Sequence, residues 1–141
     1  MVVRDADVFL AHVGDSRAYL IENGHLRQLS QDHSLVAQLV RDGQLTPEQA
    51  RSDPRRNVVT RSIGVSAHVE IDAQRFEALM RDGGTLLMCS DGLHGLIPDP
   101  ELGALASEAD LAHACRQAIA LANSRGGPDN ITVVAYAHDA Y

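Results

Sequence analysis

The chain has 141 residues, of which 45% are hydrophobic and 22% are charged, as is ordinary for one soluble globular domain. Its formal net charge of −7 disfavours nucleic acid or an anionic membrane surface as the main partner. No apolar run approaches the roughly 18 residues of a membrane span, nothing resembles a signal peptide, and the two cysteines have no CxxC spacing, so we expect a cytoplasmic protein without a membrane or nucleic-acid partner.

The first part of the chain predicts three consecutive antiparallel strands. The apolar run 7–13 is typical of a buried strand, and the segments 16–21 and 26–29 predict two more. Asn23-Gly24 between the last two favours a hairpin, because both residues tolerate positive φ.

The middle of the chain predicts two short helices followed by two strands. Segment 34–42 has apolar residues at helical spacing, with Ser34 as the N-cap and Gly43 beyond the end. Thr46-Pro47 favours the start of a second helix, since proline is compatible with the first helical turn. The segments 58–63 and 69–76 then predict strands.

The last part of the chain predicts a central strand, two helices and a closing strand. The continuous apolar run 85–89 is typical of a central strand. Helices are expected near 101–106 and over 110–124, the second with an apolar stripe of Leu111, Cys115, Ala118, Ile119 and Ala122. Segment 131–137 closes the chain as a strand. This order predicts an α+β fold of antiparallel sheets flanked by helices.

Three aspartates lie at the ends of apolar strands and are the candidate metal ligands. Asp15 follows the first strand, Asp91 follows the central strand, and Asp129 precedes the last one. Strand ends hold carboxylates rigidly, and the hard cations Mg²⁺ and Mn²⁺ prefer such oxygen ligands. Each aspartate also has an ordinary explanation, in turn chemistry or, for Asp15, in pairing with Arg17. The residues alone leave the two explanations open.

Other catalytic arrangements are disfavoured. The sequence contains no HExxH, GxSxG or GxxxxGK[ST] pattern, and the closeness of Ser90 and His94 is attributed to chance. His12 is interpreted as a satisfied core histidine, and His33 as a loop or surface residue. Both cysteines, Cys89 and Cys115, are expected to act as small buried hydrophobic residues.

Taken together, several motifs resemble the bacterial PP2C-type (PPM) serine/threonine protein phosphatases. They occur in the order of that family and span nearly the whole chain: AHVGDSRAY at 11–19, QDHS at 31–34, LTPE at 45–48, PRRN at 54–57, LMCSDGL at 87–93 and GGPDNITVV at 126–134. A single SDG is a weak signal, whereas an ordered series of motifs is a strong one.

The resemblance implies a two-layer β-sandwich flanked by helices. It also implies hydrolysis of phosphoserine and phosphothreonine in phosphorylated proteins by a metal-activated water, at two Mn²⁺ or Mg²⁺ ions with a third, weaker position. By motif, Asp91 and Asp129 would be ligands of the two-metal centre and Asp15 would join Asp91 at the third position. Asn130 and Gly92 would support these ligands, and residues 36–57 would form a flap over the substrate. The preferred metal, the physiological substrate and the oligomeric state stay open.

The front of the family pattern has no counterpart in this sequence. The family also has an arginine motif that holds the phosphate, an early acidic ligand and a DGxGG loop whose aspartate bridges both metals, and none of these precedes Asp7. We therefore expect the N-terminal part of the domain to be missing, and the chain alone to have little phosphatase activity. The alternative is a non-catalytic truncated pseudophosphatase or an interaction module that adds strands to another chain.

Overall fold

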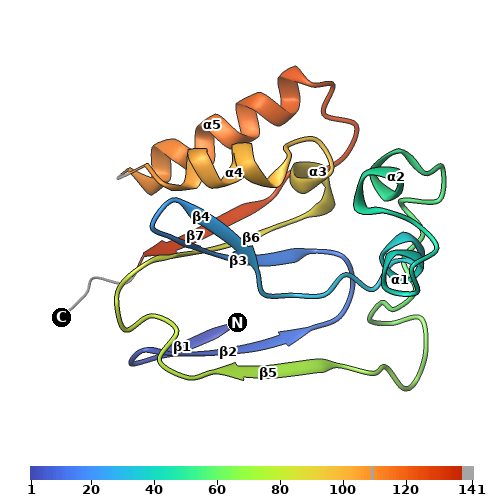
Figure 1. Cartoon of the computed structure of the whole chain (residues 1–141), viewed down its shortest axis with the longest axis horizontal. Helices are drawn as coiled ribbons and strands as arrows, with labels where there is room; N and C mark the ends of the chain where they lie inside the picture. The colour runs from blue at the N-terminus through green and yellow to red at the C-terminus, as the bar shows by residue number, and fades with distance from the viewer. Residues whose placement is uncertain (109, 138–141) are drawn as a thin grey trace.

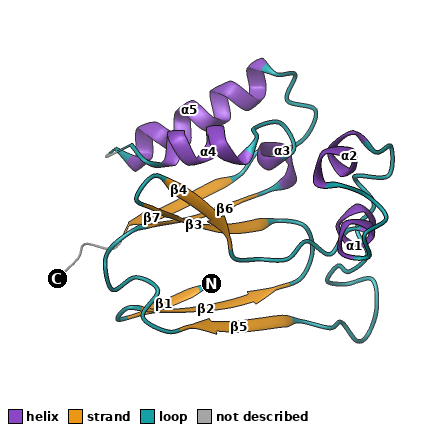
Figure 2. Ribbon diagram, in the orientation of Figure 1, coloured by secondary structure: helices purple, strands orange, loops and turns teal. Residues whose placement is uncertain are grey.

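Two antiparallel sheets lie in layers, and helices cover one of them (Figures 1 and 2). The computed structural model describes residues 1–108 and 110–137. The first sheet has the order β1 (Val2–Arg4), β2 (Asp7–His12), β5 (Asp72–Phe76). The second has the order β4 (His25–Gln28), β3 (Arg17–Glu22), β6 (Thr85–Cys89), β7 (Val133–Ala137). The predicted α+β sandwich with flanking helices is confirmed.

The prediction of three consecutive paired strands at the start was wrong. β3 and β4 form the expected hairpin, with positive φ at Asn23 and Gly24, but β2 and β3 do not pair. β2 pairs instead with β1, a strand that was not predicted, and with β5. The connection through Gly14 and Asp15 therefore crosses from one sheet to the other, with Gly14 at a φ of 113°.

The second sheet lies between two apolar layers, which explains why its central strands are buried on both faces. Tyr19 and Ile21 belong to the cluster beneath the helices, with Leu87 and Leu93. Ala18 and Leu20 point the other way, into the cluster between the sheets. The alternation follows from the two-residue period of a strand. The prediction of β6 as a central strand is confirmed by its pairing with both β3 and β7.

Three helices cover the outer face of the second sheet: α3 (Asp91–His94), α4 (Asp99–Ala106) and α5 (Leu111–Ser124) (Figure 1). The N-cap of α5 is Asp110, whose carboxylate accepts the His113 N–H at 2.9 Å. The residues that α5 buries are Ala114, Ala118 and Ala122, while the larger members of the predicted stripe are half-buried. The short helix α3 was not predicted. No helix among the described residues is long and apolar enough to cross a membrane.

The predicted flap, residues 36–57, takes in nearly all of α1 (Leu35–Arg41) and all of α2 (Pro47–Ser52). Ser34 caps α1, and Thr46 forms a capping box with Gln49, as the sequence patterns predicted. Both helices lie beside the ends of the two sheets (Figure 2). The strand predicted at 58–63 was wrong: Val59 makes a single β-bridge with Ser34, and the rest of that segment has no strand partner.

Candidate functional site

The segments carrying Asp91 and Asp129 lie side by side at one edge of the second sheet. Asp91 begins α3 directly after β6, and Asp129 lies before β7, which pairs with β6. Ser90 joins the two segments: its backbone N–H donates to the Thr132 carbonyl at 3.1 Å, and its hydroxyl donates to the Asn130 carbonyl at 3.1 Å. The Ser90 hydroxyl bonds to Asn130 and the His94 ring to Asp15, so the two side chains form no catalytic pair.

Gly92 allows the closest approach of these segments. A Cβ atom built on Gly92 would overlap with the backbone carbonyl of Asn130. Any larger residue would therefore force α3 away from the segment that carries Asp129. The two residues expected to support the ligands are thus in direct contact with each other.

Each of these two aspartates is oriented by the residue that follows it. The Gly92 N–H donates to one carboxylate oxygen of Asp91 at 3.0 Å, and the Asn130 N–H donates to one carboxylate oxygen of Asp129 at 2.7 Å. The second oxygen of each carboxylate accepts no hydrogen bond from the described residues. Both side chains can therefore offer an oriented oxygen to a cation.

Asp15 approaches the same place from the connection between the sheets. Burial raises the pKa of Asp15, and the negative charge of Asp91 raises it further, so these two carboxylates are close enough to repel each other. The Nε2–H of His94 donates to the Asp15 backbone carbonyl at 2.9 Å. Burial and the charge of Arg17 lower the pKa of His94.

His33 lies in a loop, which agrees with its interpretation as a loop or surface residue, but it is buried, with an exposed fraction of 3%. Its ring Nδ1 accepts the Gly14 N–H at 3.1 Å, and its own backbone N–H donates to the Gly14 carbonyl at 2.8 Å. Because Nδ1 accepts, Nε2 carries the proton and donates to Asp72 at 2.9 Å. His33 thus fixes the peptide next to Asp15 and ties it to the first sheet.

His12 is half-buried in β2, and its interpretation as a satisfied core histidine was wrong. Its Nε2 is buried and has no hydrogen-bond partner among residues 1–108 and 110–137, and its ring lies 5.0 Å from the ring of His33. An unpaired buried nitrogen is a cost to folding.

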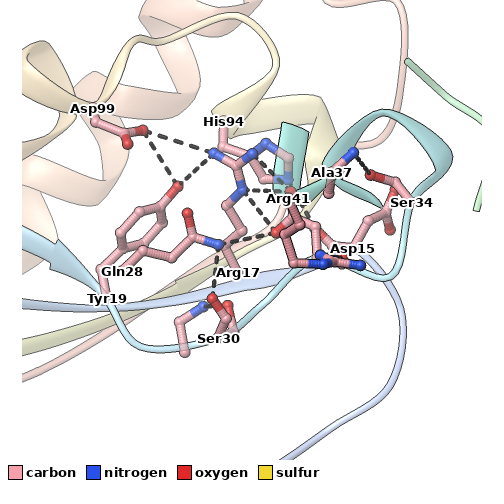
Figure 3. A network of polar contacts seen from close by, with 12 residues as sticks. Asp15, Arg17, Tyr19, Gln28, Ser30, Ser34, Ala37, Arg41, His94 and Asp99 are labelled. Atoms are coloured by element: carbon pink, nitrogen blue, oxygen red, sulfur yellow. Dashed lines mark hydrogen bonds and ion pairs between the residues drawn. The ribbon is translucent and has the colours of Figure 1, made fainter. Parts of the chain in front are cut away.

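Arg17 pairs with Asp32, and not with Asp15 as one interpretation of the sequence had it. Its guanidinium donates to both carboxylate oxygens of Asp32, the shortest bond being 2.7 Å, and also reaches the Tyr19 hydroxyl at 3.2 Å. Burial acts to lower the pKa of Arg17, but the hydrogen bonds to Asp32 outweigh burial and the pKa is raised. Figure 3 shows this network, which extends to Gln28, Asp99 and the flap residue Arg41.

A cavity of about 530 Å³ opens between the carboxylates and the flap. Asp15, Asp91 and His94 line one part of it, and the flap contributes residues from α1, α2 and the loop that follows. Asp129 does not line the cavity and is exposed. Cys89 is buried and does not line the cavity. Burial raises the pKa of its thiol to about 12, so the thiol stays protonated and is unsuited to nucleophilic chemistry.

The residues present fit a hard divalent cation in kind but supply an incomplete set of ligands. Carboxylate oxygens from Asp15 and Asp91 are the donors that Mg²⁺ and Mn²⁺ prefer. Within 1–108 and 110–137, however, no group of three or more histidine, cysteine, aspartate or glutamate side chains is arranged to hold a metal ion. Two other polar features of this region, the buried His33 and the Arg17–Asp32 pair, were not predicted. Their residues belong to the motifs, but no local pattern indicates these contacts.

Comparison with known proteins agrees with this architecture. The family model described as Protein phosphatase 2C matches residues 1–38. The serine/threonine phosphatase stp of Listeria monocytogenes is 42% identical over 139 residues, which is 98% of this chain and 54% of that protein. The chain is similar to PP2C-type serine/threonine phosphatases over nearly its whole length. It spans about half the length of the curated relatives it matches.

Solved structures of PP2C-type phosphatases share the fold. The S. agalactiae serine/threonine phosphatase superposes with a TM-score of 0.87 at 39% identity, covering 96% of this chain and 55% of that one. The catalytic domain of the phosphatase PstP in complex with two manganese ions superposes with a TM-score of 0.85 at 34% identity, covering 98% and 56%. The likeness thus extends over nearly all of this chain and about half of each PP2C-type relative.

Proposed function

We propose that this protein hydrolyses phosphoserine and phosphothreonine in phosphorylated proteins, as a phosphatase that depends on Mn²⁺ or Mg²⁺. The observation that carries the proposal is the meeting of the Asp91-Gly92 and Asp129-Asn130 segments beside Asp15, in a chain 42% identical to a serine/threonine phosphatase. The two manganese ions in the PstP complex support the choice of cation.

In this proposal Asp91 and Asp129 hold the ions of a two-metal centre, and Asp15 joins Asp91 at a third position. Bound ions of this kind lower the pKa of a coordinated water and neutralise phosphoryl charge. The chain itself orients the ligands, since the N–H groups of Gly92 and Asn130 hold the two carboxylates. The flap bounds the cavity through which the phosphorylated segment would reach the carboxylates.

The test is hydrolysis of p-nitrophenyl phosphate with manganese, with EDTA, and with Asp91→Asn. Because the chain matches about half of each relative, it is assayed both alone and fused to the segment of the Listeria monocytogenes phosphatase that it does not match. We expect turnover by the fusion that requires manganese and is lost in Asp91→Asn, and little turnover by the chain alone. Equal rates in EDTA, or an unaffected Asp91→Asn fusion, would refute the proposed site.

A non-catalytic interaction module is the second candidate. The observation in its favour is that no three potential ligand side chains converge within the described part of the chain. A fusion that is folded by circular dichroism, runs as a single species on gel filtration and has no activity with manganese would support this alternative.

A further inference from the structure

The flap contributes basic side chains to the lining of the cavity. Arg41 of α1, Arg51 of α2 and Arg56 of the following loop line the cavity and are exposed. Asp15 and Asp91 line the same cavity from the segments that follow β2 and β6. The cavity therefore has an acidic part, which the proposed function assigns to metal ions and the phosphoryl group, and a basic part to which that function assigns nothing.

The charges of these flap arginines are weakly compensated by the protein. Arg17, also in the cavity wall, is neutralised by Asp32. Arg41 reaches only the Asp32 backbone carbonyl, at 3.4 Å. The charge of Arg51 contributes to lowering the pKa of Glu48, but the two side chains form no ion pair. Arg56 likewise forms no ion pair with any described residue. The neighbouring Arg55, which does not line the cavity, is by contrast paired with Asp53 at 2.8 Å.

The lining near these arginines suits a peptide segment more than a small free anion. Val36, Val40, Pro47 and Ala50 provide apolar contacts on the same side. All twelve basic residues of the chain are arginines, and the planar guanidinium binds carboxylates and phosphates with two parallel hydrogen bonds. A cavity of about 530 Å³ has room for a side chain next to the one that enters the acidic part.

We propose that Arg51 and Arg56 form a subsite for a second anionic group of the substrate, a glutamate, aspartate or further phosphate next to the residue to be dephosphorylated. This inference rests on the proposed function, because it takes the carboxylate part of the cavity as the phosphoryl site. The substrates of the protein are then phosphoproteins whose modified residue lies within an acidic segment.

The test measures binding and needs no turnover. Two fluorescently labelled phosphoserine peptides, flanked by glutamates in one and by glutamines in the other, are titrated with the chain in EDTA and followed by anisotropy. We expect the glutamate peptide to bind about fivefold to tenfold more tightly at low salt, and the preference to vanish in Arg51→Gln/Arg56→Gln. The matched control is Arg27→Gln/Arg116→Gln, which removes the same charge from exposed positions outside the cavity and should keep the preference.

Equal affinity for the two peptides would overturn the subsite, and so would a preference that survives in Arg51→Gln/Arg56→Gln. Loss of the preference in both double variants would reduce it to a general effect of net charge and would also overturn the subsite. The proposed phosphatase function fails by a different readout, the absence of manganese-dependent turnover in the fusion, so the two failures are distinguishable.

Discussion

Gly92 lies directly against the backbone carbonyl of Asn130, with no room for a Cβ atom between them. This contact brings the start of α3 against the segment before β7, and with them the two aspartates that the motifs single out. Its geometry depends on the absence of a side chain at one position.

Gly92→Ala should therefore separate the two aspartate segments. We expect a loss of about 1–3 kcal/mol in the free energy of unfolding, because the added methyl group overpacks a tight contact. Manganese affinity, measured by calorimetry on the folded variant, should fall as well. Gly24→Ala is the matched control: it strains a residue with a φ of 75° by about 1 kcal/mol, far from the aspartates, and should leave manganese affinity unchanged. Unaltered manganese affinity in Gly92→Ala would contradict the expectation.

Asp32→Asn should be strongly destabilising, because it leaves the largely buried guanidinium of Arg17 without its counter-charge. The side chains of Arg17 and Asp32 are 21% and 9% exposed. Breaking such a pair costs about 2–4 kcal/mol, which urea denaturation would measure. Asp53→Asn, which breaks the more exposed pair with Arg55, should cost clearly less. Similar losses of unfolding free energy in Asp32→Asn and Asp53→Asn would show that burial does not make the Arg17–Asp32 pair more important to stability than the exposed pair.

The stability contributed by Asp72 should disappear in acid. The hydrogen bond from His33 lowers the pKa of Asp72 in the folded protein below its ordinary value of 3.8. The stabilisation is therefore fully present above the unfolded-state pKa and is lost as the pH falls through the lower folded-state pKa. Wild type should exceed Asp72→Asn by about 0.5–1 kcal/mol at neutral pH, and the gap should close below about pH 4. Urea titrations across this range test the point, and a gap that does not change with pH would be the contrary result.

Removing one of the two neighbouring carboxylates should have opposite effects with and without a cation. In EDTA, Asp91→Asn relieves repulsion with Asp15 and should stabilise the chain by about 0.5 kcal/mol. In manganese, wild type should gain stability and Asp91→Asn should gain little, since ligand binding stabilises only the state that binds. Thermal unfolding of both proteins in both buffers decides this. An equal gain from manganese in the two proteins would place any bound ion away from Asp91.

Local patterns predicted those parts of the fold that local physics controls. The capping residues Ser34 and Thr46 begin helices as expected, Asn23-Gly24 forms the hairpin, and the apolar run 85–89 is the central strand β6. At each of these, the signal and its structural consequence lie within a few residues.

Partners distant in sequence could not be predicted in this way. Nothing in Gly14-Asp15-Ser16 distinguishes a crossing between sheets from an ordinary turn, so β2 was assigned to the wrong neighbour. His33 lies among polar residues, and its burial depends on Asp72, which lies 39 residues further along the chain. The strand expected at 58–63 has the right composition, but in the part of the chain that the structure describes it makes a single β-bridge, between Val59 and Ser34. The nearness of Asp91 and Asp129 was inferred from the motif order, since neither residue alone indicates it.

The crossing at Gly14 has a mechanical consequence. Asp15 is linked to both layers: His33 joins the neighbouring Gly14 to Asp72 of β5, and His94 of α3 donates to the Asp15 carbonyl. Asp91 begins the same helix α3 at the end of β6. A displacement of one sheet relative to the other would therefore act on the backbone of Asp15 through both bonds, so the separation of the Asp15 and Asp91 carboxylates depends on how the two sheets pack.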